Sequence, residues 1–327
     1  MEDGGGQVYL GVHPDQPSAP VTVQIPSAAV QADPTERARV RQLAEALVGR
    51  TLPGVLPVRE VGEQDGLLYA ALDIPDGIAL ATWLDALVRQ QSRFAPDFAL
   101  SMTLQVARAM LALREVIPDH VLGGFRPTRL RLSAQGQIWL CPLCVGGPLV
   151  DGEGQELRTQ LAWASSEVLL GQAPKEASDV RGLHLLLFTL VTGRNPFLRD
   201  HTAMTMTAVL RREIPTLPES VDQDVIGPAA AVLSEPRAER LPGLRQTEAT
   251  LTRLIEARGG QPSPQAWEQL AATLGLVGAP ATPEPPPLPD ADLTLTVPRA
   301  AGPSRPLLVA TLALLVALGA WIALHLA

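Results

Sequence analysis

Two cysteines separated by two residues are the first candidates for chemistry in this chain. Cys141 and Cys144 form a single C-x-x-C pair, and the sequence contains no other cysteine. Such a pair can supply two thiolates to a metal or be oxidised reversibly, but a structural zinc site needs four ligands. The sequence has no second pair and no nearby histidine. We therefore interpret both cysteines as ordinary residues at the end of a strand and predict no metal site.

The histidines give no stronger signal. His120 and His184 have no nucleophile and carboxylate at a spacing that would indicate a catalytic triad. Both are interpreted as packing residues.

The elements that must position these residues change type along the chain. Alternating apolar residues predict strands at 21–25 and 67–72. Between them, residues 34–49 predict a helix, because a proline lies near its start and a glycine at its end. The remaining chain up to residue 274 reads as mainly helical, with apolar residues at helical spacing. The clearest of these helices are predicted at 97–117, 180–192, 203–212, 244–257 and 264–274.

Three motifs follow one another in the middle of the chain. Residues 125–132 read FRPTRLRL, residues 165–167 read SSE, and Ser178-Asp179-Val180 begins an apolar run that ends in LVTGRNPF. Their order and spacing resemble the large lobe of bacterial Ser/Thr protein kinases, and further anchors extend the resemblance over about residues 4–256. The resemblance implies an α+β, two-lobed protein kinase-like fold, with a β-rich small lobe at 1–75 and a helical large lobe at 76–258.

The same register puts non-catalytic residues where kinases carry out phosphoryl transfer. It places the catalytic base at Gly124, the two metal ligands at Arg129 and Pro142, and the phosphate-binding lysine at Gln24. The acid of the small-lobe helix falls on Leu43. Phosphoryl transfer needs metal ions that neutralise phosphate charge and a carboxylate that accepts the hydroxyl proton. The resemblance therefore implies a pseudokinase, a kinase-like domain without enzymatic activity and without a bound cofactor.

Other residues match positions that hold the kinase fold together. The resemblance implies that Asp179 accepts hydrogen bonds from the backbone of the catalytic loop. It also implies that Glu167 and Arg240 form a buried ion pair that fixes the activation segment to the large lobe.

Arg126 and Arg129 lie near the position where the resemblance puts phosphate. Two guanidinium groups there could bind an anion, including ATP, without a metal ion. The alternative is that both arginines are solvated or paired with acidic residues.

The end of the chain differs in composition from the rest. Residues 259–306 are predicted to be a proline-rich linker with one short helix, and residues 307–327 are almost entirely apolar. About 20 apolar residues suffice to cross a bilayer, so we predict a single-pass transmembrane helix. Arg299 and Arg305 precede it, which places the kinase-like domain in the cytoplasm. A soluble buried helix is the alternative.

Composition and tail together indicate a signalling role. The net charge is −8 with no basic block, so nothing indicates nucleic-acid binding. We predict a membrane-tethered scaffold or allosteric binding module whose protein partner is an active kinase or a cell-envelope protein. The alternative is an unorthodox Ser/Thr kinase or a metal-free nucleotide sensor that uses Arg126 and Arg129.

Overall fold

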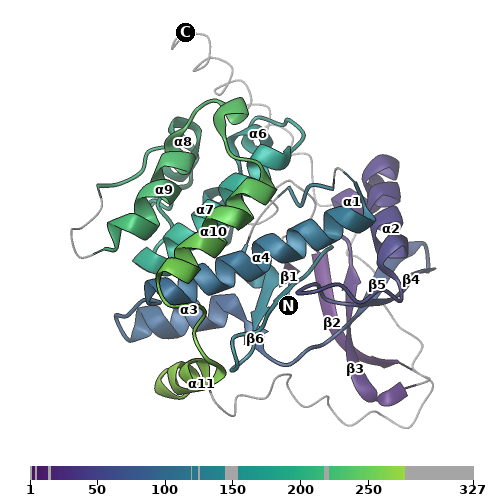
Figure 1. Ribbon diagram of the computed structural model, residues 1–327. Helices are drawn as coiled ribbons and strands as arrows, with labels where there is room; N and C mark the ends of the chain where they lie inside the picture. The colour runs from purple at the N-terminus through teal and green to yellow at the C-terminus, as the bar shows by residue number, and fades with distance from the viewer. Residues whose placement is uncertain are drawn as a thin grey trace. The chain divides into compact units, whose positions relative to one another are not determined.

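The computed structural model describes most of the chain up to residue 276. The described residues are 2–3, 6–13, 16–118, 120–123, 126–143, 154–216 and 221–276. They belong to a compact unit that spans Met1–Pro283, and the second unit, Glu284–Ala327, lies outside them. The elements of the first unit are labelled in Figure 1.

A five-stranded antiparallel sheet forms the first lobe (Figure 1). Strands β4 and β5 form a hairpin, and both Asp65 and Gly66 at its tip have positive φ, as a two-residue hairpin turn requires. Successive side chains of β5 point to opposite faces, and those of Leu68, Ala70 and Leu72 are buried. The strand order is β1-β2-β3-β5-β4, with bounds Glu2–Asp3, Gly6–His13, Gln16–Ile25, Leu67–Asp73 and Val58–Gln64.

Two helices follow β3. The short helix α1 spans Ala28–Ala32, and α2 spans Pro34–Leu47. Asp33 caps α2, because its carboxylate accepts hydrogen bonds from two backbone N–H groups of the first turn. The buried face of α2 has helical spacing and consists of Val40, Leu43, Ala44 and Leu47.

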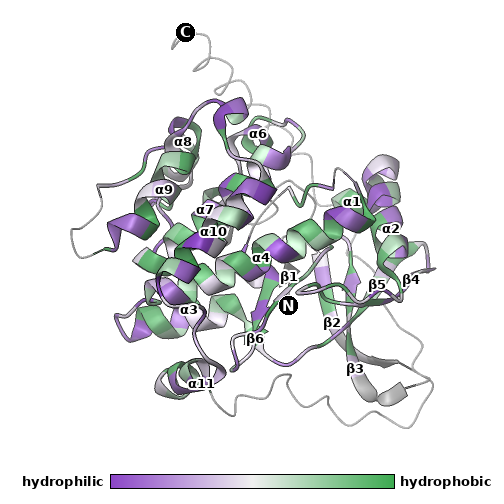
Figure 2. Ribbon diagram, in the orientation of Figure 1, coloured by the Kyte–Doolittle hydropathy of each residue, from purple (hydrophilic) through white to green (hydrophobic). Residues whose placement is uncertain are grey.

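The second lobe is mainly helical. Helices α4 (Pro96–Val116) and α7 (Glu176–Thr192) are its most deeply buried elements, and α4 carries green, apolar residues along its length in Figure 2. Helix α10 packs against α4, and α9 packs against α7. The other helices are α3 (Leu80–Arg89), α5 (Gly154–Trp163), α6 (Ser166–Leu169), α8 (Thr202–Arg211), α9 (Gln223–Ser234), α10 (Leu244–Ala257) and α11 (Pro264–Thr273), with short 3-10 helices η1 (Pro127–Arg129) and η2 (Ala238–Arg240).

A small second sheet connects the two lobes. It consists of β6 (Ile78–Ala79), β7 (Leu130–Leu132) and β8 (Ile138–Leu140). The segment after α2 joins β8 through two backbone hydrogen bonds, from Leu140 N–H to Gly54 O at 2.7 Å and from Leu56 N–H to Leu140 O at 2.9 Å. The residues that follow β8 are therefore held next to the first lobe.

The last described helix is packed into the helical lobe. Trp267 of α11 is 2% exposed and contacts Phe98 edge-to-face, with the ring centres 4.5 Å apart. Trp83 and Phe94 complete this aromatic cluster. A side chain at Gly136 would clash with the Trp267 indole, since an added Cβ would lie 2.2 Å from its Nε1. The segment that we predicted to be a linker from residue 259 therefore begins with a packed helix.

The two-lobed α+β architecture that the sequence predicts is confirmed. The strands at 21–25 and 67–72 and the helix at 34–49 are present, each within a few residues of its predicted bounds. Among the helices of the described ranges, α1, α3, α5, α6 and α9 were not predicted, and α9 contains Pro228 in its interior. Within the described ranges no helix is long and apolar enough to cross a bilayer, and the predicted membrane helix at 307–327 lies outside those ranges.

Candidate functional site

Gln24 occupies the position that the resemblance gives to the phosphate-binding lysine. It lies on β3 opposite Ala70 of β5 and is 7% exposed. Its amide Nε2 donates to the Cys141 Sγ at 3.2 Å, and the same thiol lies 3.6 Å from the carbonyl oxygen of Leu143. The side chain thus joins the first lobe to the segment that follows β8. An amide in this contact is neither free nor charged.

Helix α2 supplies no carboxylate to this place. Leu43, which stands at the predicted position of the helix acid, is 6% exposed and belongs to the main hydrophobic core. Glu45, two residues later, is exposed to solvent. At the register position of the helix acid, α2 thus carries a buried apolar side chain.

Arg129, at the position of one metal ligand, is directed into the protein. It ends η1 and is 5% exposed. Its Nη2 donates to the backbone carbonyl of Cys141 at 3.3 Å, and the Cys141 N–H donates to the Arg129 carbonyl at 2.9 Å. Arg126, the other half of the predicted anion-binding pair, is only half-buried. The two arginines therefore differ in environment, and Arg129 does not face open solvent.

The remaining catalytic positions are Pro142 and Gly124. Pro142 is buried between Cys141 and Leu143 and has no side-chain oxygen. Gly124 lies outside the described residues, as does Cys144. Across the part of the chain that the structure describes, no cluster of His, Cys, Asp and Glu could hold a metal ion. The described catalytic positions thus supply an amide, a guanidinium group and a proline ring.

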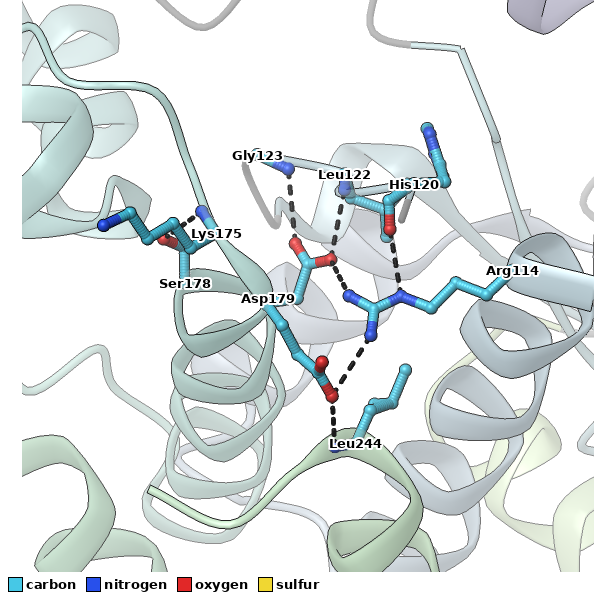
Figure 3. A network of polar contacts seen from close by, with 9 residues as sticks. Arg114, His120, Leu122, Gly123, Lys175, Ser178, Asp179 and Leu244 are labelled. Atoms are coloured by element: carbon cyan, nitrogen blue, oxygen red, sulfur yellow. Dashed lines mark hydrogen bonds and ion pairs between the residues drawn. The ribbon is translucent and has the colours of Figure 1, made fainter. Parts of the chain in front are cut away.

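Asp179 lies at the centre of a polar network (Figure 3). Its Oδ2 accepts a hydrogen bond from Leu122 N–H at 3.1 Å, and its Oδ1 accepts one from Gly123 N–H at 3.2 Å. These are the contacts with the catalytic-loop backbone that the resemblance implies. Arg114 of α4 adds an ion pair to the Asp179 Oδ2 at 3.4 Å.

Arg114 extends the network to two further segments. Its Nε donates to the His120 carbonyl at 2.9 Å, and its Nη1 lies 3.1 Å from the Glu176 Oε1. That carboxylate also accepts a hydrogen bond from Leu244 N–H, at the first turn of α10, at 2.7 Å (Figure 3). One guanidinium group thus connects α4, α7, α10 and the loop that precedes the catalytic position.

Burial shifts the pKa values of two groups here, and in each case it favours the neutral form. Desolvation raises the pKa of Asp179 to about 6, against the lowering effect of the Leu122 N–H and Arg114. Desolvation lowers the pKa of His120 to about 4, and the positive charges of Arg129, Arg39 and Arg114 lower it further. His120 is therefore neutral at physiological pH.

The partner predicted for Glu167 is wrong. Glu167 pairs with Arg181 of α7, whose Nη1 lies 3.3 Å from the Glu167 Oε1. The Arg181 Nη2 also donates to the backbone carbonyl of Glu235 at 2.7 Å. Arg240 is exposed, on a 3-10 helix with no buried residue. Arg181 thus contacts both segments, and it takes the role in the ion pair that was predicted for Arg240.

Comparisons with known proteins agree with this architecture. The chain is 27% identical over 225 residues to the Ser/Thr protein kinase PkaB of Streptomyces coelicolor, a match that covers 64% of this chain and 50% of that protein. It is 29% identical over 245 residues to the Ser/Thr protein kinase PknJ of Mycobacterium bovis, covering 70% and 38%. The chain thus matches half or less of the length of these relatives, and no family model matches it.

A solved structure has a similar fold. The crystal structure of the Mycobacterium tuberculosis PknI kinase domain superposes with a TM-score of 0.58 at 23% identity, covering 77% of this chain and 91% of that domain. At this identity the likeness concerns the fold. The chain contains a protein kinase-like domain related to those of bacterial Ser/Thr protein kinases.

Proposed function

We propose that this domain is a pseudokinase, which binds other proteins and does not transfer phosphate. The observation that supports this most directly is the contact between Gln24 and Cys141. The side chain at the lysine position is buried and bonded to the residue that precedes Pro142. A hydrogen bond between two side chains of the protein therefore lies where a kinase would hold phosphate and metal.

The chemistry of the neighbouring positions supports the same proposal. Mg²⁺ requires oxygen ligands, usually including a carboxylate, and Arg129 and Pro142 supply none. The positive charge of Arg129 repels a metal ion, and the sequence has glycine at the base position. A side chain lost at one position can be replaced by a neighbour, but here base and metal ligands are lost together.

An assay for phosphate transfer tests the proposal. The purified full chain is incubated with radiolabelled ATP, Mg²⁺ or Mn²⁺ and a general kinase substrate, with an active bacterial Ser/Thr kinase as the positive control. We expect no labelling of substrate or of the chain itself. Labelling that disappears in a Gln24→Ala or Arg126→Ala variant would show that the site is catalytic after all.

A melting experiment tests nucleotide binding separately. A ligand at one hundred times its dissociation constant adds about 2.7 kcal/mol to the free energy of unfolding. We expect no shift with ATP, either with Mg²⁺ or with EDTA. A shift in EDTA that an Arg126→Ala variant abolishes would instead favour the metal-free nucleotide sensor.

We further propose that residues 307–327 tether the domain to the cell membrane from the cytoplasmic side. The apolar composition of this segment and the preceding Arg299 and Arg305 support this part. Cells expressing the full chain and a chain ending at residue 306 are fractionated, and intact spheroplasts are treated with protease. We expect the full chain alone in the membrane fraction, with its kinase-like domain protected. A soluble full chain would contradict the tether, and digestion from outside would contradict the orientation.

A tether would confine the domain to the membrane surface, where its partners would be an active kinase or a cell-envelope protein. Crosslinking in whole cells, with the untethered chain as the control, tests this part. Crosslinks to such a protein that depend on the tether are expected. Crosslinks confined to soluble proteins unrelated to signalling would contradict it.

A further inference from the structure

A cleft of about 690 Å³ lies between α2 and the segment that leads to the catalytic loop. One wall is a stripe of α2, and the other is formed by residues 116–118, 120–123 and 173–174. Its size falls within the range of about 300–1,000 Å³ that small-molecule sites occupy. Neither Gln24 nor Pro142 is among its described lining residues, so it is separate from the former nucleotide position.

The two walls of the cleft differ in polarity. The α2 wall presents Glu36, Arg39 and Gln42, which follow one another at helical spacing. The opposite wall is mostly aliphatic and includes Ile117 and Leu122, the latter 5% exposed. Ligand sites usually combine an apolar lining with a few polar groups in this manner.

Arg39 supplies a cation that a negative ligand group can pair with at one end of the cleft. Arg39, Arg114 and Arg129 act on the lining residue His120 with positive charge and help to keep it neutral. Arg39 is paired with Glu36 at 2.9 Å, but its side chain is 42% exposed, so the pair is open to competition. A ligand carboxylate can therefore approach Arg39 beside an imidazole that carries no charge.

We propose that the cleft between α2 and residues 116–118 and 120–123 binds a small organic anion with an apolar body, its carboxylate next to Arg39 and its body against Ile117 and Leu122. Such a ligand would bridge the two lobes. The domain would then respond to a metabolite rather than to ATP.

A matched pair of probes tests the proposal. Naphthylacetate and naphthylacetamide have the same shape and differ in charge. Each is titrated by calorimetry into the purified full chain in a neutral detergent. We expect saturable binding of the acid, and binding of the amide weaker by about tenfold, the factor that about 1.4 kcal/mol of charge-assisted hydrogen bonding corresponds to.

Variants of α2 locate the binding. Arg39→Gln should weaken binding of the acid about tenfold and leave binding of the amide unchanged. Ala46→Trp should abolish binding of both probes, because Ala46 lines the cleft and the indole would obstruct it. Arg41→Gln is the matched control: Arg41 also lies on α2 and pairs with Glu63, but it is outside the lining.

Melting temperatures establish that each variant is folded. The proposal fails if the acid does not saturate, if acid and amide bind equally well, or if Arg41→Gln weakens binding as much as Arg39→Gln. It also fails if a folded Ala46→Trp variant binds as the wild type does. None of these outcomes bears on phosphate transfer, so the pseudokinase proposal is tested independently.

Discussion

The Asp179 network and the region that the resemblance assigns to phosphate lie in the same domain, and they match the kinase pattern to very different degrees. At Asp179, the carboxylate makes the two backbone contacts that the resemblance implies. At Gln24, Arg129 and Pro142, other residues stand at the kinase positions, and the Gln24 amide and the Arg129 guanidinium group both donate to Cys141. Asp179, Gln24 and Arg129 are all buried.

The two regions differ in the role of their polar side chains. The Asp179 carboxylate satisfies backbone N–H groups that would otherwise be buried without acceptors, so the fold depends on it whether or not ATP binds. In an active kinase, by contrast, the charged groups at the phosphate site act on nucleotide and metal. Without those ligands, a buried lysine or aspartate there would be an unpaired charge, and an amide bonded to a thiol is less costly. The four predictions below test this contrast.

The largest effect is expected for Asp179→Ala. Breaking a buried ion pair costs about 3–5 kcal/mol, and the orphaned N–H groups of Leu122 and Gly123 add to this. We expect the free energy of unfolding to fall by about 5 kcal/mol in urea denaturation. Asp224→Ala, at an exposed position of α9, is the control and should change it by less than about 0.5 kcal/mol. Equal effects of the two changes would mean that Asp179 does not hold the loop.

A second prediction separates Arg181 from Arg240. Arg181→Ala leaves the partly buried Glu167 carboxylate and the Glu235 carbonyl without their partner, and should cost about 3 kcal/mol. Arg240→Ala removes an exposed side chain and should cost less than about 0.5 kcal/mol. Urea denaturation of both variants checks this. A larger effect of Arg240→Ala would restore the pairing that the sequence predicted.

These two sites show how far sequence reasoning reaches. The resemblance to kinases was enough to assign Asp179 its backbone contacts, because Ser178-Asp179-Val180 and the residues after it match the kinase motif closely. The same spacing could not identify the partner of Glu167. The sequence does not distinguish Arg181 from Arg240 as the partner. Only the tertiary structure does, because Arg181 of α7 contacts Glu167 of α6 and the Glu235 carbonyl at the end of α9.

Contacts between residues far apart in the sequence could not be predicted for a related reason. Gln24 and Cys141 are 117 positions apart, and no pattern in either segment indicates the other. Helix α9 was missed because Pro228 lies inside it, and proline normally argues against a helix interior. The packing of α11 depends on Gly136, whose missing side chain makes room for Trp267. Gly136 and Trp267 are far apart in the sequence, so neither segment alone predicts this contact.

A third prediction concerns pH. The folded pKa of His120, about 4, is below the usual 6.5, so the unfolded state binds its proton first. Stability from this group is present above about pH 6.5 and is lost as pH falls toward 4, by at most about 1.4 kcal/mol per pH unit. His184, also lowered by burial, acts in the same direction. Asp179 acts oppositely between about pH 6 and 4, because its folded pKa is raised to about 6.

The measurement is the free energy of unfolding between pH 7.5 and 4.5, for the wild type and a His120→Gln variant. The variant should have the smaller loss between about pH 7 and 6, because Asp179 titrates in both proteins and only the wild type has the contribution of His120. Identical slopes in that window would show that His120 is solvated and protonates normally in the folded state.

The smallest effect, and the one closest to the proposed function, is the coupling between Gln24 and Cys141. A double-mutant cycle with Gln24→Leu and Cys141→Ala should give a coupling of about 1 kcal/mol, the net contribution of one buried hydrogen bond. Cys141→Ala combined with Gln31→Leu is the control, since Gln31 bonds instead to the backbone of Leu68, and should be additive. Cys141→Ser should keep the coupling, because a hydroxyl also accepts from an amide. If the Gln24 cycle is additive too, the amide and the thiol are merely neighbours. No side-chain hydrogen bond would then span the phosphate site, and only the absence of the charged kinase side chains would disfavour nucleotide binding.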